Sequence, residues 1–383
     1  MGVLSGYRVI ELAGLGPCPM AGMLLADMGA EVIVIDRGPI TDPMFVRDVS
    51  RRGKKSIIVN LKSDAGRETL LKLVESADVL IEGFRPGVTE KLGVGPEECQ
   101  TVNPALVYGR MTGWGQEGPF SRVSGHDINY ISLVGALHAV RAAGEKPVPP
   151  VNLVGDFGGG TMFLVMGVLA ALLEARVSGK GQVVDAAMVD GAANLMWMCH
   201  SFHAADSWDF DQPGTNWLDG GAYYYGTYEC ADGEYVAVGA LEPQFFTQFV
   251  ELAELDQSIF NVEQQMDRSR WPAMKIELAR AIKKKTRDQW VAIFEGTDAC
   301  FTGVYSALEA PQHPHNKARG TYQEVDGDIQ ASPAPRFSRT PSAIAHGMHQ
   351  PGADTVDVLQ TLGLDKQQIQ SLLDQGAVKS DNS

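Results

Sequence analysis

Cysteine is scarce in this chain, and the distribution of the cysteines argues against structural disulfides and a cysteine-ligated zinc site. The 383 residues contain five cysteines, an odd number without any Cys-x-x-Cys pair. This pattern argues against a disulfide framework and a zinc site, and it is typical of free thiols in a reducing compartment. His200 and His203 follow Cys199, but no acidic residue stands at ligand spacing, so we expect no metal there.

Positive charge and long apolar runs are also in short supply. The chain has 32 Lys and Arg against 47 Asp and Glu, and its net charge of −15 argues against nucleic-acid binding. The longest apolar run, from Met162 to Leu173, is interrupted by Gly167 and is shorter than a membrane span. Residues 1–10 lack a signal-peptide pattern, and residues 379–383 do not form a peroxisomal tripeptide. We therefore expect a cytoplasmic protein without a membrane segment.

Residues 37–62 depart from this acidic background. They contain seven Lys or Arg and two Asp, a local net charge of +5. A charge run is usually a solvated face. The contrast with the rest of the chain instead favours a pocket for a phosphorylated ligand, because Arg and Lys side chains suit phosphate oxygens.

The N-terminal part alternates between strand and helix patterns. Residues 7–12 and 31–36 read as strands, and a Gly- and Pro-rich loop at 14–22 enters a helix between them. This is a Rossmann-type βαβ unit. The third glycine of the dinucleotide fingerprint is missing, and Pro17 and Pro19 remove two N–H groups. We therefore expect the scaffold without a nicotinamide or flavin dinucleotide.

The same alternation continues to residue 118. Strands are expected at 56–59, 79–81 and 106–108, with a helix at 64–77, which predicts a doubly wound parallel sheet. Ligands bind such sheets beyond the carboxyl ends of the strands. The loops after the second and third strands would therefore place Arg37 and Lys62 in one crevice.

A second pattern begins after residue 187. An Asp-Gly turn at 231–234 joins aromatic and β-branched runs at 223–228 and 235–239, which is a hairpin signal, and a mostly helical segment follows. We expect an α/β protein with a Rossmann-like large domain and a smaller α+β domain. The predicted large domain is 1–187, completed by 332–383 with a last helix at 355–375. The predicted small domain is 228–318, and the linkers are 188–227 and 319–331.

The central stretch from Gly125 to Asp156 contains two predicted helix starts. Apolar residues at 128, 131, 134, 137 and 140 form one helix face after Asp127, and a fully apolar helix follows Gly160. Free N–H groups and the positive end of the dipole make a helix start suitable for stabilising a developing anion. Considered singly, His126 and Asp156 are each better explained as a residue at a helix start, because Asp is a preferred capping residue.

Several sequence blocks, in order along nearly the whole chain, carry a family resemblance: residues 125–130, 152–156, 179–183, 218–222, 240–245 and 296–300. The chain resembles the family III CoA-transferase superfamily, and within it the α-methylacyl-CoA racemases. The resemblance implies interlocked homodimers that bind acyl-CoA on the large domain, with each active site completed by the small domain of the partner subunit. It implies no separate cofactor, because CoA is part of the substrate.

The resemblance also implies roles for individual residues. His126 and Asp156 would act as acid and base on opposite faces of the α-carbon of a 2-methylacyl-CoA, since one side chain cannot easily reach both. Asp156 needs a pKa raised by burial, and Glu242 would orient His126. The N–H groups at Asp127 would bind the enolate oxygen. The implied substrate-binding residues are Arg37, Val59, Asn60, Leu61, Lys62, Arg85, Gly125, Asp127 and Tyr130.

Two other functions fit the same scaffold. In a CoA-transferase, Asp156 would be a nucleophile that forms an aspartyl intermediate. A catalytically silent protein would only bind acyl-CoA. The presence of both His126 and Glu242 favours proton transfer, which needs them, over acyl exchange, which does not.

Overall fold

The computed structural model describes residues 2–381, so the first residue and the last two, on which the terminal sequence predictions partly depend, lie outside the described part. The chain forms two compact units. The sheet unit comprises Met1–Val134, Val151–Leu195 and His315–Ser383, and the second unit comprises Gly135–Pro150 and Met196–Pro314. The chain thus leaves the sheet unit twice and returns to it twice.

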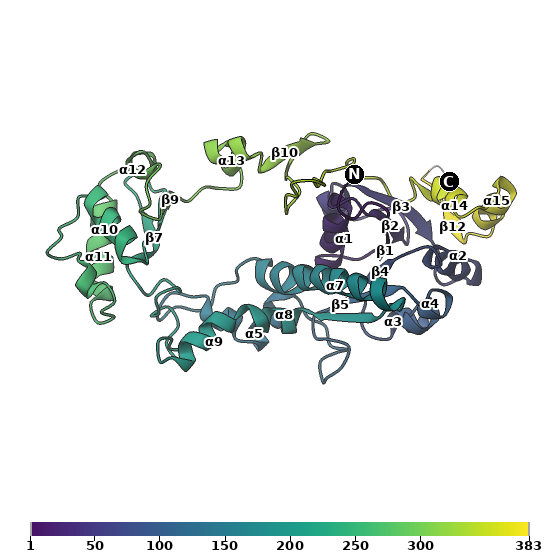
Figure 1. Cartoon of the computed structure of the whole chain (residues 1–383), viewed down its shortest axis with the longest axis horizontal. Helices are drawn as coiled ribbons and strands as arrows, with labels where there is room; N and C mark the ends of the chain where they lie inside the picture. The colour runs from purple at the N-terminus through teal and green to yellow at the C-terminus, as the bar shows by residue number, and fades with distance from the viewer. Residues whose placement is uncertain (1, 382–383) are drawn as a thin grey trace. The chain divides into compact units, whose positions relative to one another are not determined.

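A seven-stranded sheet in the order β12-β3-β2-β1-β4-β5-β6 organises the sheet unit (Figure 1). Six strands are parallel, and only β12 at one edge is antiparallel to its neighbour β3. This confirms the predicted α/β class and the mostly parallel sheet. The strands are β1 (Arg8–Leu12), β2 (Glu31–Asp36), β3 (Lys54–Val59), β4 (Val79–Glu82), β5 (Val107–Thr112), β6 (Val183–Ala187) and β12 (Val378–Lys379).

Helices cover both faces of this sheet because its central strands are apolar on both sides. One core joins the sheet to α1 (Pro17–Asp27) and α7 (Met162–Ser178). The opposite core joins it to α2 (Asp64–Val74), α14 (Thr355–Thr361) and α15 (Lys366–Asp374). The shorter helices of the unit are α3 (Val88–Lys91), α4 (Pro96–Val102), α5 (Asp127–Leu133) and α8 (Met188–Leu195).

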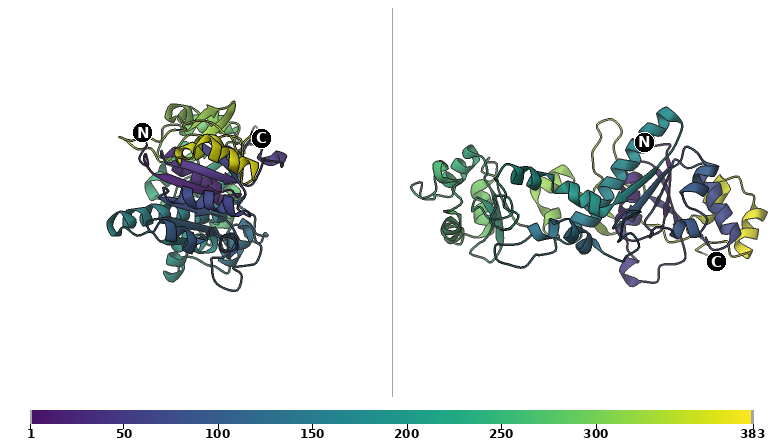
Figure 2. Two further views of the ribbon diagram at one scale, coloured as in Figure 1. Left: turned by 90° about the vertical axis from the view of Figure 1, so that its right-hand side faces the viewer. Right: turned by 90° about the horizontal axis from the view of Figure 1, so that it is seen from below.

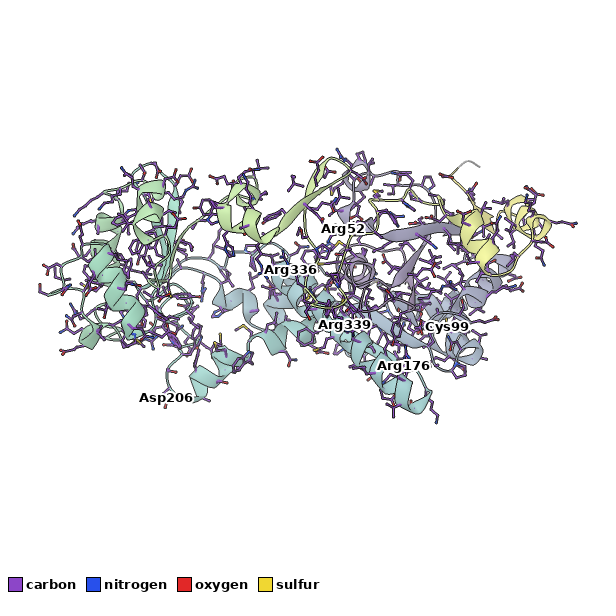
Figure 3. The ribbon with its side chains drawn as sticks, turned by 45° about the horizontal axis from the view of Figure 1, so that its top comes forward. Arg52, Cys99, Arg176, Asp206, Arg336 and Arg339 are labelled. Carbon is purple, nitrogen blue, oxygen red and sulfur yellow. The ribbon has the colours of Figure 1, made fainter. Side chains whose placement is uncertain are left out.

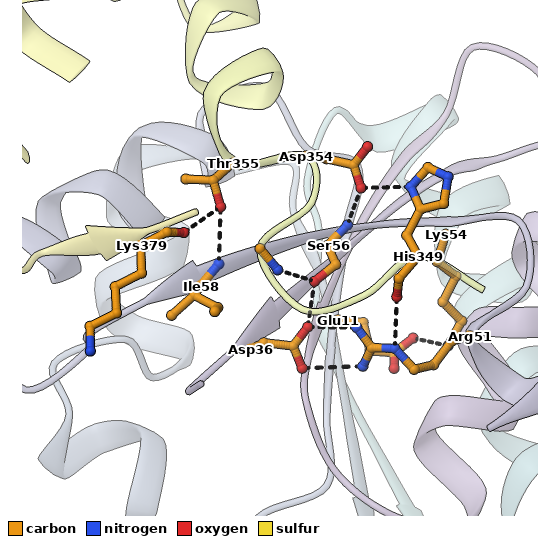
Figure 4. Close-up of polar contacts among 11 residues, drawn as sticks. Glu11, Asp36, Arg51, Lys54, Ser56, Ile58, His349, Asp354, Thr355 and Lys379 are labelled. Carbon is orange, nitrogen blue, oxygen red and sulfur yellow. Dashed lines mark hydrogen bonds and ion pairs between the residues drawn. The ribbon is translucent and has the colours of Figure 1, made fainter. Parts of the chain in front are cut away.

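Most of the basic segment at 37–62 is structural, which limits the prediction of a phosphate pocket to its two ends. Lys54 pairs with Glu11 at 2.6 Å and Arg51 with Asp36 at 2.7 Å (Figure 4), and all four side chains are nearly buried. Arg52, labelled in Figure 3, forms a third buried pair with Asp27. Counting charges along the segment could not reveal these pairs, because every carboxylate partner comes from another part of the chain.

The C-terminal segment returns to β3. Asp354 accepts hydrogen bonds from the backbone N–H of Ser56 and from His349, each at 2.8 Å (Figure 4). The single helix predicted at 355–375 is divided into α14 and α15, with Gly363 between them at φ 80°. The predicted return linker contains an antiparallel hairpin of β10 (Tyr322–Val325) and β11 (Asp328–Ala331) (Figure 2).

The second unit has an aromatic core beneath a three-stranded antiparallel sheet. The predicted hairpin is confirmed as β7 (Tyr225–Glu229) and β8 (Tyr235–Gly239), and β9 (Phe301–Gly303) extends it. Its larger helices are α9 (Trp197–Ala204), α10 (Pro243–Leu252), α11 (Trp271–Ile282) and α12 (Arg287–Phe294).

Helix α7 and the π-helical turn before it form the most apolar segment. Among the described residues, only Leu153–Ser178 is long and apolar enough to cross a membrane, with a mean hydropathy of 1.7. The predicted apolar run is therefore part of a longer helix. The buried side of α7 packs on β5 and β6, and a core helix of this kind meets the same length and hydropathy criterion as a membrane span.

Candidate active site

The first helix start of the central stretch is held by an aromatic pair. His126 is the N-cap of α5, and its N–H donates to Asn129 Oδ1 at 3.0 Å. The Tyr130 hydroxyl donates to the carbonyl of Gly125, and the Trp114 ring packs edge-to-face on Tyr130 at 4.8 Å. The backbone on both sides of His126 is therefore fixed, while its imidazole is exposed. The predicted long helix ends early, because α5 stops at Leu133 and Gly135 takes a φ of 80°.

Asp156 lies in the second segment, a π-helical turn over Leu153–Thr161 that runs into α7. Its half-buried carboxylate accepts a hydrogen bond from Asn152 Nδ2 at 3.0 Å. Burial raises the pKa of Asp156 above its ordinary value, the Asn152 hydrogen bond opposes this rise, Asp127 adds to it, and His126 lowers it. The direction is the one that a carboxylate base requires.

Close backbone contacts hold this turn against α8. A Cβ built on Gly191 would lie 1.9 Å from the carbonyl oxygen of Gly159, so only glycine permits the approach. On the opposite side, a Cβ on Gly16 would lie 3.5 Å from Asp156 Oδ2. The Asp156 carboxylate therefore faces the loop that enters α1.

A cavity of about 370 Å³ surrounds the His126 side of this arrangement, and we call it the reaction cavity. His126, Gly125, Tyr130 and Arg85 line it, together with Leu15 and Pro17 of the loop next to Asp156. Among the nine predicted substrate-binding residues, three therefore share a cavity with the predicted acid/base histidine. Arg85 also donates to Ser124 Oγ at 2.7 Å.

A second cavity of about 510 Å³ opens at the carboxyl ends of β1, β2 and β3, and we call it the strand-end cavity. Five predicted substrate-binding residues line it, which confirms that Arg37 and Lys62 share one crevice. Phe84, Val88 and Lys91, which the sequence patterns did not single out, also line it. The predicted residues are Arg37, Val59, Asn60, Leu61 and Lys62.

Phe84 lines both cavities, and buried charges hold the loop that carries it. Glu82 accepts from the Phe84 N–H at 2.6 Å and from Arg110 Nε at 2.9 Å, and Arg110 also pairs with Glu90 of α3. Burial raises the pKa of Glu82 to about 7, although the Phe84 N–H and Arg110 oppose the rise. The loop after β4 and helix α3 are thus tied to one arginine.

Three predicted site residues, Asp127, Asp156 and Glu242, line neither cavity. The Asp127 side chain is only 5% exposed and does not line either cavity. Its Oδ2 accepts from the N–H groups of Gly155 at 2.6 Å and Asp156 at 2.8 Å. Glu242 is the exposed N-cap residue of α10 and belongs to the second unit, whereas His126 and Asp156 belong to the sheet unit. Sequence spacing did not reveal the hydrogen bond of Asn152 to Asp156 or those of the Asp127 carboxylate to the turn that carries Asp156.

Neither cavity has the composition of a metal centre. Across the described residues, no group of three or more His, Cys, Asp and Glu is placed to hold a metal ion. The described cysteines are free, and Cys18, Cys99 (labelled in Figure 3) and Cys230 are buried.

Comparison with known proteins shows the family to which the chain is similar. The pattern of CoA-transferase family III matches residues 4–355. The chain is 44% identical to the α-methylacyl-CoA racemase of Mus musculus, over 99% of this chain and 98% of the relative. It is 42% identical to the Homo sapiens racemase, over 96% of each chain. The crystal structure of Rv3272 from Mycobacterium tuberculosis is similar, with a TM-score of 0.78 and 26% identity, covering 93% of this chain and 99% of that one.

Proposed function

The chain belongs to CoA-transferase family III, and from its close homologues we propose that it interconverts the (R) and (S) forms of 2-methylacyl-CoA thioesters, which would make it an isomerase. The single observation that carries the proposal is the high identity to α-methylacyl-CoA racemases over nearly the full chain. The site geometry supports it, because the two candidate acid/base residues belong to segments that hydrogen bonds join.

The reaction needs one group to remove the α-proton and another to return a proton to the opposite face. In one direction His126 takes the proton, the C–H electron pair moves into the thioester as an enolate, and protonated Asp156 donates to the other face. In the reverse direction the two roles exchange. The raised pKa of Asp156 supports this role, because a carboxyl group with a higher pKa is a stronger base and is more readily protonated to act as the acid.

The enolate oxygen would bind at the start of α5. We assign this role to the backbone N–H of Asp127, which lies in the first turn of the helix immediately after His126. Donors placed where negative charge develops act most strongly in a site that excludes water.

The CoA carrier would occupy the strand-end cavity. Arg37 and Lys62 are exposed at its rim and suit phosphate oxygens, and the apolar wall around Val59 and Leu61 suits the adenine ring. Phe84, shared by both cavities, would lie beside the pantetheine arm. A thioester that enters the reaction cavity past Phe84 would bring its α-carbon to His126.

A second copy of the chain would complete the site. Helix α7 exposes an apolar stripe at helical spacing, with Met166 58%, Leu173 72% and Val177 89% exposed, and a second copy would cover it. Glu242 of the partner subunit would then reach His126, as the family resemblance implies. A His126→Ala subunit co-refolded with a Glu242→Ala subunit would give heterodimers in which one site carries both defects and the other carries neither. We expect up to about half of wild-type activity per heterodimer, whereas no recovery would contradict the shared site.

The main experiment is α-proton exchange of a 2-methylacyl-CoA in D₂O without any acceptor acid. The proposal predicts deuterium at the α-carbon together with racemisation. Exchange that is absent, while CoA passes to an added carboxylic acid, would instead support a CoA-transferase with Asp156 as nucleophile. Binding without exchange or transfer would support a silent acyl-CoA-binding protein.

A further inference from the structure

Asp127 connects the two segments that carry the candidate acid/base residues. It follows His126 directly in the chain, and its Oδ2 accepts hydrogen bonds from the N–H groups of Gly155 and Asp156 at 2.6 and 2.8 Å. The connection joins residues 28 and 29 positions apart in sequence. The side chain is 5% exposed, so water does not compete effectively for either bond.

The chemistry of this contact suits a carboxylate. The first turn of a helix leaves backbone N–H groups without intrahelical partners, and one charged oxygen satisfies two of them here. The approach also needs Gly155, because a Cβ at that position would lie 2.6 Å from Asp127 Oδ2. The contact therefore sets the distance between the start of α5 and the turn that carries Asp156.

We propose that Asp127 is a positioning residue, whose carboxylate holds Asp156 at a fixed separation from His126 and whose negative charge strengthens Asp156 as a base. This inference rests on the proposed racemase function for its catalytic meaning. It differs from the role of the Asp127 backbone N–H, because it concerns the side chain, which is buried and lines neither cavity.

The charges around Asp156 support the second part of the proposal. The titratable groups that interact with it are Asp127, His126 and Tyr130, and Gly16 of the loop entering α1 lies next to its Oδ2. Burial is the main cause of the raised pKa of Asp156, and Asp127 contributes in the same direction. Removing the Asp127 charge should therefore lower that pKa.

Two substitutions separate geometry from charge. Asp127→Asn keeps an oxygen that can accept both N–H groups but removes the charge. We expect its kcat to stay within about tenfold of wild type, while the acid limb of the pH profile moves to lower pH when Asp156 is the base. Asp127→Ala removes the contact, and a misplacement of about 1 Å should lower kcat roughly 100-fold with KM changed less than about threefold.

Asp365→Ala is the matched control for these variants. Asp365 also caps a helix in the sheet unit, by accepting from the Gln368 N–H at 2.9 Å, and it lines neither cavity. We expect this control to lower the thermal midpoint without changing kcat or the pH profile. If Asp127→Ala behaves in the same way as Asp365→Ala, Asp127 is only a structural cap and the proposal is overturned.

An infrared titration of Asp156 tests the proposal without relying on turnover. The Asp156 carboxyl band is identified by its absence in Asp156→Asn, and its midpoint is then compared between wild type and Asp127→Asn. We expect a lower midpoint in Asp127→Asn, and an unchanged midpoint would overturn the proposal even if Asp127→Ala fails to fold. If wild type shows no α-proton exchange, the racemase function fails, while the titration still reports on Asp127.

Discussion

The two cavities of the sheet unit are built in different ways. Around the His126 side of the reaction cavity, hydrogen bonds fix the segments that carry the chemical groups: Tyr130 binds the Gly125 carbonyl, Asn152 binds the Asp156 carboxylate, and Asp127 binds the backbone of the turn that carries Asp156. In the strand-end cavity, parallel strands supply a rigid apolar wall, and the cations at its rim are exposed. Among the described residues, neither Arg37 nor Lys62 has a side-chain ion pair.

The difference between the two cavities follows from the task that each would have. Proton transfer requires acid and base at set positions on either side of one carbon atom, so small displacements are costly. Binding a phosphorylated carrier requires positive charge that can adjust to a ligand, and exposed Arg and Lys side chains provide it. Activity at the reaction cavity should therefore be sensitive to packing, and affinity at the strand-end cavity should be sensitive to charge and salt.

The largest expected effect is on packing behind the reaction cavity. Gly191→Ala would place a methyl group 1.9 Å from the Gly159 carbonyl oxygen, and neither backbone can move aside cheaply. We expect the free energy of unfolding to fall by about 3 kcal/mol, with loss of α-proton exchange. Chemical denaturation measures the first quantity.

Gly38→Ala is the control for this substitution, because a Cβ there would meet no atom within 4 Å. If folded Gly191→Ala retains CoA binding while it loses exchange, the two cavities are separable as described. Normal exchange in Gly191→Ala would show that the turn carrying Asp156 tolerates displacement.

In the strand-end cavity, Arg37→Ala should weaken CoA binding about tenfold, because one phosphate contact of this kind contributes roughly 1.4 kcal/mol. A pantetheine thioester lacks the nucleotide phosphates, so its affinity should not change. Calorimetric titration at two salt concentrations measures both affinities, and wild-type CoA binding should weaken with salt. Unchanged CoA affinity in Arg37→Ala would show that Arg37 is a solvated surface charge that does not bind CoA.

A smaller effect is expected at Glu82, which supports the loop between the cavities. Its pKa is raised by burial from 4.5 in the unfolded chain to about 7 in the folded chain. The folded state therefore binds the proton more tightly, and this contribution to stability is present below pH 4.5 and is lost as the pH rises through about 7.

Thermal unfolding across this pH range tests the linkage. Glu82→Gln removes the titrating proton but keeps an oxygen for the Phe84 N–H, so the fall in thermal midpoint between pH 4.5 and 7 should become shallower than in wild type. Equal slopes in the two proteins would mean that Glu82 is already ionised in the folded state across this range.

Sequence patterns predicted the helices and strands well where residues close together in the sequence determine the local structure. The strand at 31–36 was predicted with its observed bounds, and the hairpin of β7 and β8 was found from its Asp-Gly turn. Both helix starts of the central stretch were correct in place. The predicted helix faces ran too long, because Gly135 and Gly363 take positive φ values that periodicity does not reveal.

The contacts that assemble the site were harder to predict because they are distant in sequence. The basic segment contained three cations that are neutralised by Glu11, Asp27 and Asp36, and no local pattern shows such pairs. Asp127 was predicted to act through its backbone N–H, whereas its carboxylate binds the N–H of Gly155, 28 residues away. The acid/base roles of His126 and Asp156 came from family resemblance, since each residue alone also fits a helix cap.

The most direct test of the two-base account follows each enantiomer separately. His126→Ala and Asp156→Ala are each incubated with (R)- and with (S)-2-methylacyl-CoA in D₂O, and the initial rate of α-proton exchange is measured after CoA binding has been verified. The account predicts that each variant loses exchange mainly with one enantiomer, and that the two variants have opposite preferences, because each lacks the base on one face. Equal loss with both enantiomers in both variants would contradict the assignment of His126 and Asp156 to opposite faces.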